Sequence, residues 1–437
     1  MSGKEIITKL PTAQLFNSIV KSGIDIGASF IHIEPSSETV IVKYRVDGNL
    51  LEADKIPKKR FNGLLDKIKT LANIPPGHND LIASGKFKFT LNNSTYRLLI
   101  YIIPTINGEK VTIKLHSDDV LTLDIKQLGF WGDSLITIQD NLLLKKGLMV
   151  ISGPGDSGKS TTLATLLNNI ETSRNIATLE DPVEYKIKSA NQIQINPKTK
   201  LTFQSAIKIL LKQDIDILMI SEIHEKKLAS LVIDLAAHKR MVITSIYADS
   251  AARTITKLSE LDTQTTSLAY LLRLVINQRL LKKLCDKCKV CVPLDKEASS
   301  KLNDIFQLNK ASHIEYIHQL EKDYLLEHSS NQKESLRLST KLSTTKSKIK
   351  HIYKAKEGGC TECLGRGYKG RLMVFEILKN NQSIENLILG NAKETLINNQ
   401  AVKNGMISIL LDALVKALVG DTTLEEVFHI ANNYMVV

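Results

Sequence analysis

The chain has 437 residues, more than one hydrophobic core usually serves, so we expect about two to four domains. Apolar residues make up 43% of the sequence, an ordinary share for a globular protein, and no uninterrupted apolar stretch is long enough to cross a bilayer. The net charge is +12, but the lysines are spread along the chain without an aromatic stacking platform, so no direct nucleic-acid contact is expected. The first residues lack the apolar core of a secretion signal, which predicts a cytoplasmic protein.

Residues 1–118 are predicted to form an α+β module. Apolar spacing indicates helices over 11–22 and 61–72. The predicted strands cover 30–34, 40–46, 49–51, 87–91, 96–103 and 110–115, with tight turns at Asp47-Gly48 and Asn107-Gly108.

Residues 119–280 alternate between strand and helix signals, which is typical of a nucleotide-binding α/β core. Short apolar runs predict buried parallel strands over 148–151, 175–179, 217–220 and 241–244. Helices are predicted between them, notably over 202–212 and 226–237.

A phosphate-binding loop follows the first strand of this core. Residues 153–160 fit the pattern G-x-x-x-x-G-K-[ST] and stand between an apolar strand and the start of a helix. A helix start offers unpaired N–H groups to phosphate, Lys159 would reach the β- and γ-phosphates, and the Ser160 hydroxyl would ligate Mg²⁺. The residues predicted to bind nucleotide here are Gly153, Pro154, Gly155, Asp156, Ser157, Gly158, Lys159, Ser160 and Thr161.

Acidic residues close two other predicted strands. Glu222 ends the run 214–222 and is the candidate to polarise an attacking water; Asp216, before the strand, is the weaker candidate. Glu180, with Asp181 and Glu184 nearby, would face the same crevice and help to hold the cation. Ordinary strand ends capped by surface acids are the alternative.

A cysteine-bearing segment is predicted over 281–375, with an insertion at about 295–356. Cys285 and Cys288 form one C-x-x-C pair, and Cys360 and Cys363 form another, which matches tetrahedral Zn²⁺. The alternative is free or redox-active thiols, and Cys291 is a fifth thiol that could compete as a ligand.

The rest of the chain divides into a basic stretch and a helical tail. Residues 329–350 are rich in Lys, Ser and Thr, which favours a solvated or mobile insertion over a nucleic-acid patch. Residues 376–437 are predicted to be helical, over 384–389, 407–418 and 424–432.

Taken in order, these features extend over nearly the whole chain, which resembles the secretion ATPases of type II secretion and type IV pilus assembly. The motifs that carry the resemblance are Ala28-Ser-Phe-Ile-His-Ile-Glu-Pro35, Tyr44-Arg-Val-Asp-Gly48, Pro104-Thr-Ile-Asn-Gly-Glu-Lys110, Leu179-Glu-Asp-Pro-Val-Glu184, Asn191-Gln-Ile-Gln-Ile-Asn-Pro197, Leu211-Lys-Gln-Asp214, Gln278-Arg279-Leu280, the cysteine pairs, Gly367-Tyr-Lys-Gly-Arg371 and Phe375-Glu-Ile377. The related retraction ATPases lack the cysteines, so the resemblance favours the assembly or export branch.

The resemblance implies a RecA-like P-loop core, a PAS-like N-terminal module, and ATP, Mg²⁺ and Zn²⁺ as ligands. It also implies a homo-hexameric ring, peripheral to the inner membrane, that acts on an inner-membrane platform protein of a pilus or secretion machine.

The chain departs from the family pattern at several site positions. Asp156 follows Gly155 where the family has Thr-Gly, Ser221 replaces a glycine and His224 an arginine. Tyr247 and Arg240 stand where the family has histidines, and Leu99 and Lys114 where it has arginines that reach the γ-phosphate. Arg97 lies two residues from Leu99, on the same face of a strand, and is the candidate to replace it.

The sequence therefore predicts an ATP-hydrolysing motor subunit, with Glu222, Glu180 and Lys159 as catalytic residues and Arg97 and Lys114 as cations acting on a neighbouring subunit. The alternative is a ring subunit that binds nucleotide without hydrolysing it. A nucleic-acid translocase is a third hypothesis, resting only on charge and a motor core.

Overall fold

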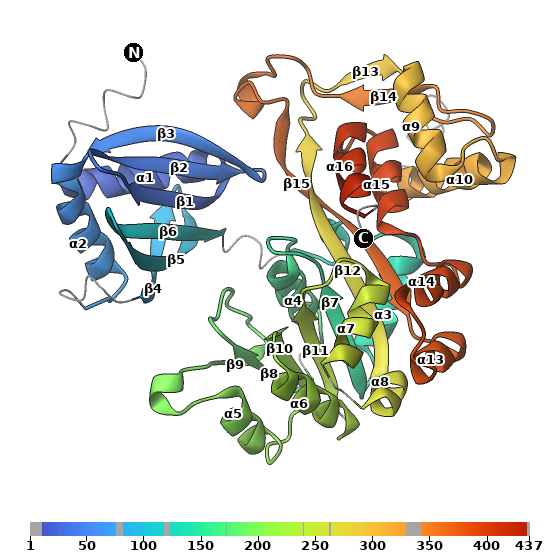
Figure 1. Cartoon of the computed structure of the whole chain (residues 1–437), viewed down its shortest axis with the longest axis horizontal. Helices are drawn as coiled ribbons and strands as arrows, with labels where there is room; N and C mark the ends of the chain where they lie inside the picture. The colour runs from blue at the N-terminus through green and yellow to red at the C-terminus, as the bar shows by residue number, and fades with distance from the viewer. Residues whose placement is uncertain are drawn as a thin grey trace. The chain divides into compact units, whose positions relative to one another are not determined.

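The computed structural model describes residues 11–75, 82–117, 123–171, 173–238, 240–261, 264–328 and 342–434. The chain divides into two compact units, Met1–Val120 and Leu121–Val437. Figure 1 shows the elements of each unit, coloured from the N-terminus to the C-terminus.

The first unit is a six-stranded antiparallel sheet with the order β3-β2-β1-β6-β5-β4. The strands are β1 (Ala28–Pro35), β2 (Thr39–Val46), β3 (Asn49–Pro57), β4 (Ala83–Leu91), β5 (Ser94–Thr105) and β6 (Gly108–Ser117), with helices α1 (Thr12–Asp25) and α2 (Phe61–Leu71). Alternate residues of β2 are buried, so one face of the sheet forms the core with both helices. The α+β character and each predicted helix and strand of this part are confirmed.

Of the two predicted tight turns, the one at Asp47-Gly48 has a backbone cause, whereas the one predicted at Asn107-Gly108 lies one residue earlier, at 106–107, because Gly108 already begins β6. Asp47 and Gly48 adopt φ values of 47° and 86°, the left-handed conformation that a two-residue hairpin turn needs. Asn92 and Asn93, at 50° and 66°, make the same kind of turn between β4 and β5. Asparagine tolerates this region better than most residues, so this second hairpin also follows from its sequence.

The second unit is built on a seven-stranded sheet with the order β15-β12-β7-β11-β10-β8-β9. The four predicted strands are confirmed as β7 (Gly147–Ser152), β8 (Ile176–Glu180), β10 (Ile217–Ile223) and β11 (Met241–Ile246), all parallel. β9 (Ala190–Gln194) and β12 (Leu272–Leu284) extend the sheet in parallel, and β15 (Tyr368–Lys379) closes it antiparallel to β12.

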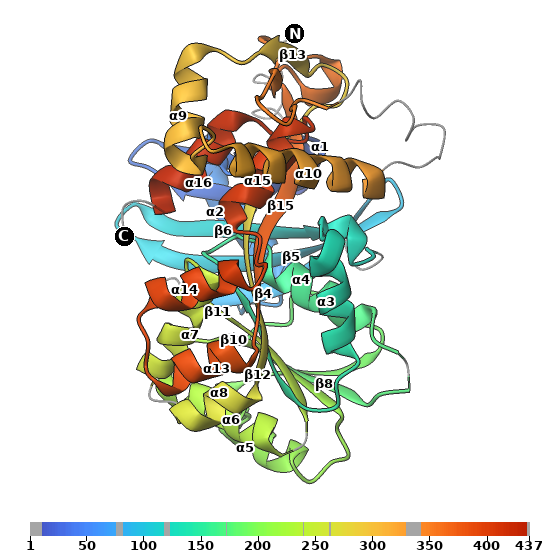
Figure 2. The ribbon, with the colours of Figure 1, turned by 90° about the vertical axis from the view of Figure 1, so that its right-hand side faces the viewer.

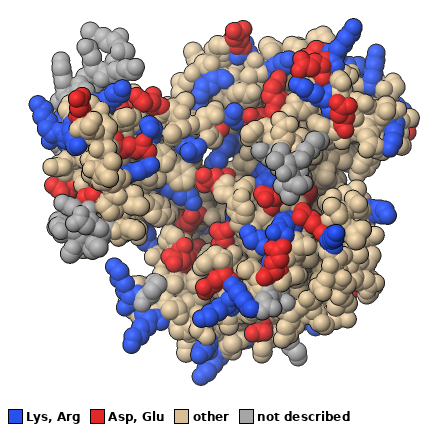
Figure 3. Space-filling model, in the orientation of Figure 1, with Lys and Arg blue, Asp and Glu red and all other residues tan. Residues whose placement is uncertain are grey.

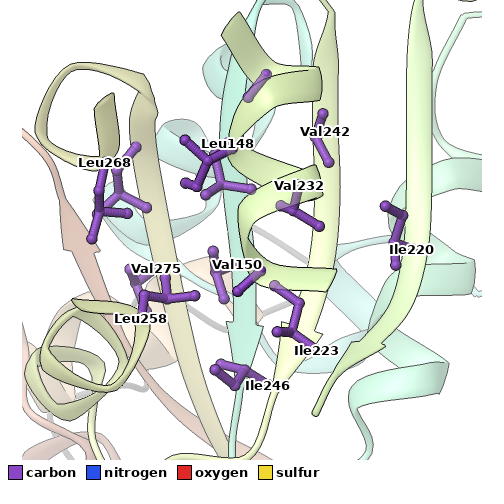
Figure 4. Close-up of a cluster of buried hydrophobic side chains, with 14 of the residues drawn as sticks. Leu148, Val150, Ile220, Ile223, Val232, Val242, Ile246, Leu258, Leu268 and Val275 are labelled. Atoms are coloured by element: carbon purple, nitrogen blue, oxygen red, sulfur yellow. The ribbon is translucent and has the colours of Figure 1, made fainter. Parts of the chain in front are cut away.

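Helices cover this sheet and bury its apolar side chains. α6 (Lys226–Ala237) packs over β7, β10 and β11, where Leu148, Val150, Ile220 and Val242 meet Val232 (Figure 4). The other helices around the sheet are α3 (Gly132–Leu142), α4 (Lys159–Asn168), α5 (Phe203–Leu210), α7 (Ala251–Glu260), α8 (Thr265–Leu271), α13 (Gln382–Leu389) and α14 (Glu394–Lys403). α13 packs on α8 and α14 on α7, so the tail of the chain lies beside the core (Figure 2).

Strands β12 and β15 form a long antiparallel ribbon that leads from the sheet to the cysteine-bearing segment (Figure 1). The domain limits proposed at 280/281 and 375/376 fall within these two strands. Beyond the ribbon lie α9 (Lys296–Phe306), α10 (Ala311–His328), the pair β13 (Val290–Pro293) and β14 (His351–Lys354), α15 (Ile409–Leu418) and α16 (Leu424–Tyr434). They share one apolar core.

The expectation of a solvated insertion over 329–350 is wrong for residues 342–344 and 349, which are buried, whereas residues 346–348 and 350 are exposed. Residues 342–344 pack against α10, where the buried Glu321 carboxylate accepts hydrogen bonds from the backbone N–H groups of Ser343 (2.6 Å) and Thr344 (3.1 Å). Ser343 also donates its hydroxyl to the Leu418 carbonyl. Ser343 and Thr344 are buried because Glu321 and the Leu418 carbonyl supply partners for their polar groups. Residues 329–341 lie outside the described part of the chain.

Within the described ranges, no helix has both the length and the apolar composition needed to cross a membrane. On the face that Figure 3 shows, Lys and Arg side chains are interspersed with Asp and Glu, in keeping with the spread of lysines along the sequence.

Candidate functional site

The loop 153–158 connects the end of β7 to the start of α4 and places two glycines where other residues would not fit. Gly153 and Gly158 adopt φ values of 151° and 89°. A Cβ atom on Gly153 would lie 2.5 Å from the Gln278 carbonyl oxygen, and one on Gly158 would lie 3.2 Å from Gln278 Nε2. The loop therefore lies directly against β12, and its backbone path depends on glycine.

Asp156 adopts the left-handed conformation at φ 57°. This is the position where the sequence carries an acid in place of a glycine, and Asp is among the few residues that enter this region at modest cost. Its side chain is exposed, so water weakens, without removing, the repulsion between this carboxylate and an anion held by the loop.

Lys159, the first residue of α4, turns its side chain back over the loop. Its ammonium donates hydrogen bonds to the carbonyl oxygens of Gly153 and Pro154, each at 3.0 Å. The same nitrogen lies 4.0 Å from Glu222 Oε1. The structure thus brings together two of the three predicted catalytic residues from elements more than fifty positions apart.

Glu222 lies near the carboxyl end of β10, with its side chain 47% exposed. His224 Nδ1 is 3.2 Å from the Glu222 carbonyl oxygen, and Ser245 donates its hydroxyl to the Ser221 carbonyl. Asp216 accepts a hydrogen bond from the Asn175 N–H at the amino end of the same strand. Because the strands are parallel, Asp216 lies at the amino ends of the strands, whereas the phosphate-binding loop lies at their carboxyl ends.

Glu180 ends β8 and is buried. Its Oε1 accepts hydrogen bonds from Thr178 Oγ1 at 2.6 Å and from Gln192 Nε2 at 2.9 Å. Burial raises the pKa of this carboxyl, and the two hydrogen bonds oppose that rise. Asp181 is exposed and Glu184 is half-buried, so the three acids have different surroundings.

The loop after β8 also contacts α4. Tyr185 places its hydroxyl 3.0 Å from Thr161 Oγ1, and burial raises the pKa of Tyr185 to about 12. Gln192 donates to the Tyr185 carbonyl as well as to Glu180. The residue pairs Glu180–Gln192 and Tyr185–Thr161 therefore hold this acidic loop beside the first turn of the helix.

Two residues of β12 that the sequence did not single out as site residues lie behind the phosphate-binding loop. Asn277 donates to Ser152 Oγ and to the Ala248 carbonyl, each at 3.0 Å. Gln278 donates to the Ser157 carbonyl at 2.8 Å. Sequence reasoning attached Gln278 to the cysteine segment; the available signal was a pair of amides directly after the apolar run Leu274–Ile276.

Tyr247 and Arg240, which stand where the family has histidines, lie at opposite ends of the same strand, β11. Tyr247 follows β11 and is 48% exposed; Lys257 donates to its carbonyl at 2.6 Å and its ammonium lies 5.0 Å from the ring centroid. Arg240 precedes β11 and donates to the carbonyl oxygens of Ile215 and Leu211. Arg240 therefore stabilises the sheet at the amino ends of its parallel strands.

Arg97 and Lys114 belong to the first unit, on the neighbouring strands β5 and β6. Lys114 is the cross-strand partner of Leu99, and Arg97 lies two residues from Leu99. Cross-strand partners share a face, so both cations lie on the same face of that sheet.

The four cysteines of the two C-x-x-C pairs meet at the far end of the β12–β15 ribbon. Their sulfur atoms all lie within 4.8 Å of one another, with 3.8 Å between Cys285 and Cys360 and between Cys288 and Cys363, and 3.7 Å between Cys360 and Cys363. The exposed Cys291 lies on β13, outside the cluster. The arrangement is a candidate metal centre.

The electrostatics of the cluster suit a metal. Burial raises the pKa of the Cys363 thiol, but hydrogen bonds from the backbone N–H groups of Cys360 and Gly367 outweigh that effect and lower the pKa to about 6. Burial and the neighbouring thiols raise the pKa of Cys288 to about 12. At neutral pH the Cys363 thiol is therefore ionised and the Cys288 thiol is protonated, so a cation bound by both sulfur atoms has to displace the proton of Cys288.

Comparison with known proteins agrees with this geometry. A family model described as Type II/IV secretion system protein matches residues 7–429. The type IV pilus assembly ATPase PilB of Thermus thermophilus is 31% identical over 401 residues, which cover 92% of this chain and 41% of that protein. The type II secretion system protein E of Xanthomonas campestris is 29% identical over 431 residues, which cover 98% of this chain and 69% of that protein.

Solved structures share the fold at low sequence identity. The Legionella pneumophila ATPase DotB matches with a TM-score of 0.62 at 15% identity, over 98% of this chain and 97% of that one. The pilus retraction motor PilT matches with a TM-score of 0.53 at 18% identity, over 94% of this chain and 96% of that one. With the loop, the acids and the family match together, the chain belongs to the type II/IV secretion system protein family, whose relatives include ATPases of type IV pilus assembly and of type II secretion.

Proposed function

We propose that this chain is an ATP-binding and ATP-hydrolysing motor subunit of a pilus assembly or type II secretion machine. The observation that carries the proposal is the loop 153–158, held between β7 and α4, with the Lys159 ammonium over it and 4.0 Å from Glu222. Backbone N–H groups at a helix start, together with one ammonium, are the usual means of holding a triphosphate.

The site residues divide the work between binding and chemistry. The backbone of 153–158 and Lys159 bind the phosphates, and Thr161 supports the first turn of α4 through Tyr185. Glu222 orients and deprotonates the attacking water. The Glu180 carboxylate is itself held in place by hydrogen bonds from Thr178 and Gln192. The Ser160 hydroxyl and the nearby carboxylates are oxygen donors of the kind Mg²⁺ prefers, and the ion would neutralise charge on the phosphates.

The wider architecture is proposed from family membership. The seven-stranded sheet would be a RecA-like core and the first unit a PAS-like module. Six chains would form a ring at the cytoplasmic side of the inner membrane and act on a platform protein. Arg97 and Lys114 would then supply cations to nucleotide held by a neighbouring subunit.

We further propose that the cysteine cluster holds Zn²⁺. Four sulfur atoms at about 2.3 Å from a central zinc ion lie about 3.8 Å apart along each edge of a tetrahedron. The sulfur–sulfur distances of 3.7–3.8 Å for Cys285–Cys360, Cys288–Cys363 and Cys360–Cys363 agree with that edge length. All four positions would be filled by protein, so the ion would be structural.

The test is Mg-ATP binding and steady-state ATP hydrolysis by the full chain and three variants. Lys159→Ala should weaken binding by at least about tenfold, because a charged hydrogen-bond donor is lost. Glu222→Gln should bind but turn over about 100-fold to 10,000-fold more slowly. Asp216→Asn is the matched control, an acid of the same strand at the opposite edge, and should behave as wild type.

The second candidate is a ring subunit that binds nucleotide without hydrolysing it. Tyr247 favours this hypothesis, since it stands near the end of β11 where the family has a histidine. Turnover by wild type that equals turnover by Lys159→Ala, combined with measurable nucleotide binding, would establish the second candidate in place of the first.

A further inference from the structure

Gln278 is a fully buried polar residue in the middle of β12, with its side chain turned toward the phosphate-binding loop. We propose that it is a positioning residue for nucleotide binding: its amide fixes the backbone of the loop so that an N–H group is presented to the phosphates. The inference rests on the proposed nucleotide-binding function and assigns part of that function to a strand outside the motif.

Both ends of the Gln278 amide are engaged. Nε2 donates to the Ser157 carbonyl oxygen at 2.8 Å, and Oε1 accepts from Thr162 Oγ1 at 2.9 Å. A carbonyl oxygen can only accept, so the nitrogen of the amide faces Ser157 and the oxygen faces Thr162. One side chain therefore connects the loop to the first turn of α4.

The contact with Ser157 sets the direction of the next N–H group. The peptide between Ser157 and Gly158 is planar and trans, so its C=O and N–H point in opposite directions. Because Gln278 holds the Ser157 oxygen toward β12, the Gly158 N–H points away from β12. An N–H that faces away from the sheet behind the loop is one that a phosphate oxygen can reach.

The close fit of the loop on β12 supports the same assignment. Cβ atoms on Gly153 and Gly158 would lie 2.5 Å from the Gln278 carbonyl oxygen and 3.2 Å from Gln278 Nε2. Two of the glycines of the motif thus face a single residue of β12. The loop approaches Gln278 closely because the Gln278 side-chain amide donates directly to a backbone carbonyl of the loop, that of Ser157.

The experiment measures the affinity of the full chain for a slowly hydrolysed ATP analogue with Mg²⁺ by calorimetry. Gln278→Met keeps the size of the side chain and removes both hydrogen bonds. We expect roughly 10-fold to 100-fold weaker binding, the usual effect of leaving a buried carbonyl without its donor. Gln278→Glu keeps the acceptor but has no N–H, and should bind at least as weakly as the methionine variant.

Thr162→Val removes the hydroxyl that fixes the orientation of the amide; this hydroxyl also lies 3.8 Å from Met373 Sδ. We expect about 3-fold to 10-fold weaker binding for this variant, and no further loss when it is combined with Gln278→Met, since the two residues act through one contact. The Thr162→Val variant carries the test if Gln278→Met does not fold.

Asn380→Ala is the matched control. Asn380 donates to the carbonyl oxygens of Ala269 and Leu272, so the variant removes two side-chain hydrogen bonds at the other end of the β12–β15 ribbon. It should lower the midpoint of thermal unfolding without changing the affinity. A Gln278→Met affinity within twofold of wild type, or equal to that of Asn380→Ala, would overturn the inference, whereas failure of wild type itself to bind would overturn the proposed function.

Discussion

Asp156 shows how one residue can depart from a motif without breaking it. Its φ of 57° is a conformation that glycine adopts freely and that Asp tolerates, so the loop keeps its path with an acid in place of a glycine. The acid makes nucleotide binding less favourable, because its carboxylate repels the negative charge of a triphosphate held by the loop.

Asp156→Gly should therefore strengthen Mg-ATP binding by a few-fold, up to about tenfold, while the free energy of unfolding changes by less than about 1 kcal/mol. Calorimetry and urea unfolding measure the two quantities. Asp47→Gly is the control, since Asp47 has a similar φ of 47° in a hairpin turn. Equal or weaker binding by Asp156→Gly would contradict the electrostatic explanation.

Glu180 offers a test of burial at the same scale. Burial raises the pKa of its carboxyl above the ordinary 4.5, so the folded chain keeps this proton over a range in which the unfolded chain has lost it. The unfolded state then binds fewer protons, and the free energy of unfolding falls as pH rises from 4.5 through the raised pKa. Below that range both states are protonated and the contribution is constant.

Glu180→Gln should remove this pH dependence, because an amide oxygen can still accept from Thr178 and Gln192 but does not ionise. The measurement is the difference in unfolding free energy between variant and wild type across a pH series. A difference that does not change with pH would show that the folded environment leaves the carboxyl unperturbed.

At the scale of elements, the β12–β15 ribbon is one part of the fold that sequence patterns did not predict. β7, β8, β10 and β11 are short apolar runs, which buried parallel strands require, and each was predicted. β12 carries Asn277, Gln278 and Arg279 in its middle, so its pattern does not match that of a buried strand. The polar residues are tolerated because the loop and the strand ends supply their partners.

The ribbon ends at the cysteine cluster, which gives a prediction for that element. Cys363→Ser should abolish binding of one zinc ion per chain and lower the midpoint of thermal unfolding by several degrees, since a structural metal contributes folding free energy. Metal content by mass spectrometry and thermal unfolding are the measurements. Cys291→Ser, a thiol outside the cluster, should change neither.

At the scale of the larger unit, a buried ion pair joins segments that are remote in sequence. Asp412 and Lys416 of α15 lie 2.8 Å apart and are at most 1% exposed. Asp412 also accepts from Trp131 Nε1 and from the Phe375 N–H, and Lys416 donates to the carbonyl oxygens of Gly129 and Met373. The pair thus connects α15 to β15 and to the segment before α3.

Lys416→Met should lower the free energy of unfolding of this unit by about 3–5 kcal/mol, because the carboxylate is left buried without its cation. The double variant with Asp412→Asn should lose less, since no charge is then buried alone. Urea unfolding compares them. A single variant as stable as wild type would show that the charges contribute little to the packing of α15.

Sequence alone determined the features whose residues are adjacent along the chain: the phosphate-binding loop, the acids that close strands, the two C-x-x-C pairs and the short apolar strands. Each depends on local backbone geometry or on spacing, which a sequence displays directly. Only the tertiary structure decided which distant residues meet. The Gln278–Thr162 contact spans 116 positions, the Cys285–Cys360 contact spans 75, and the polar residue Ser343 is buried by partners on α10 and α15. Such pairings follow from how the sheet and its ribbon bring segments together, and composition and periodicity do not encode that arrangement.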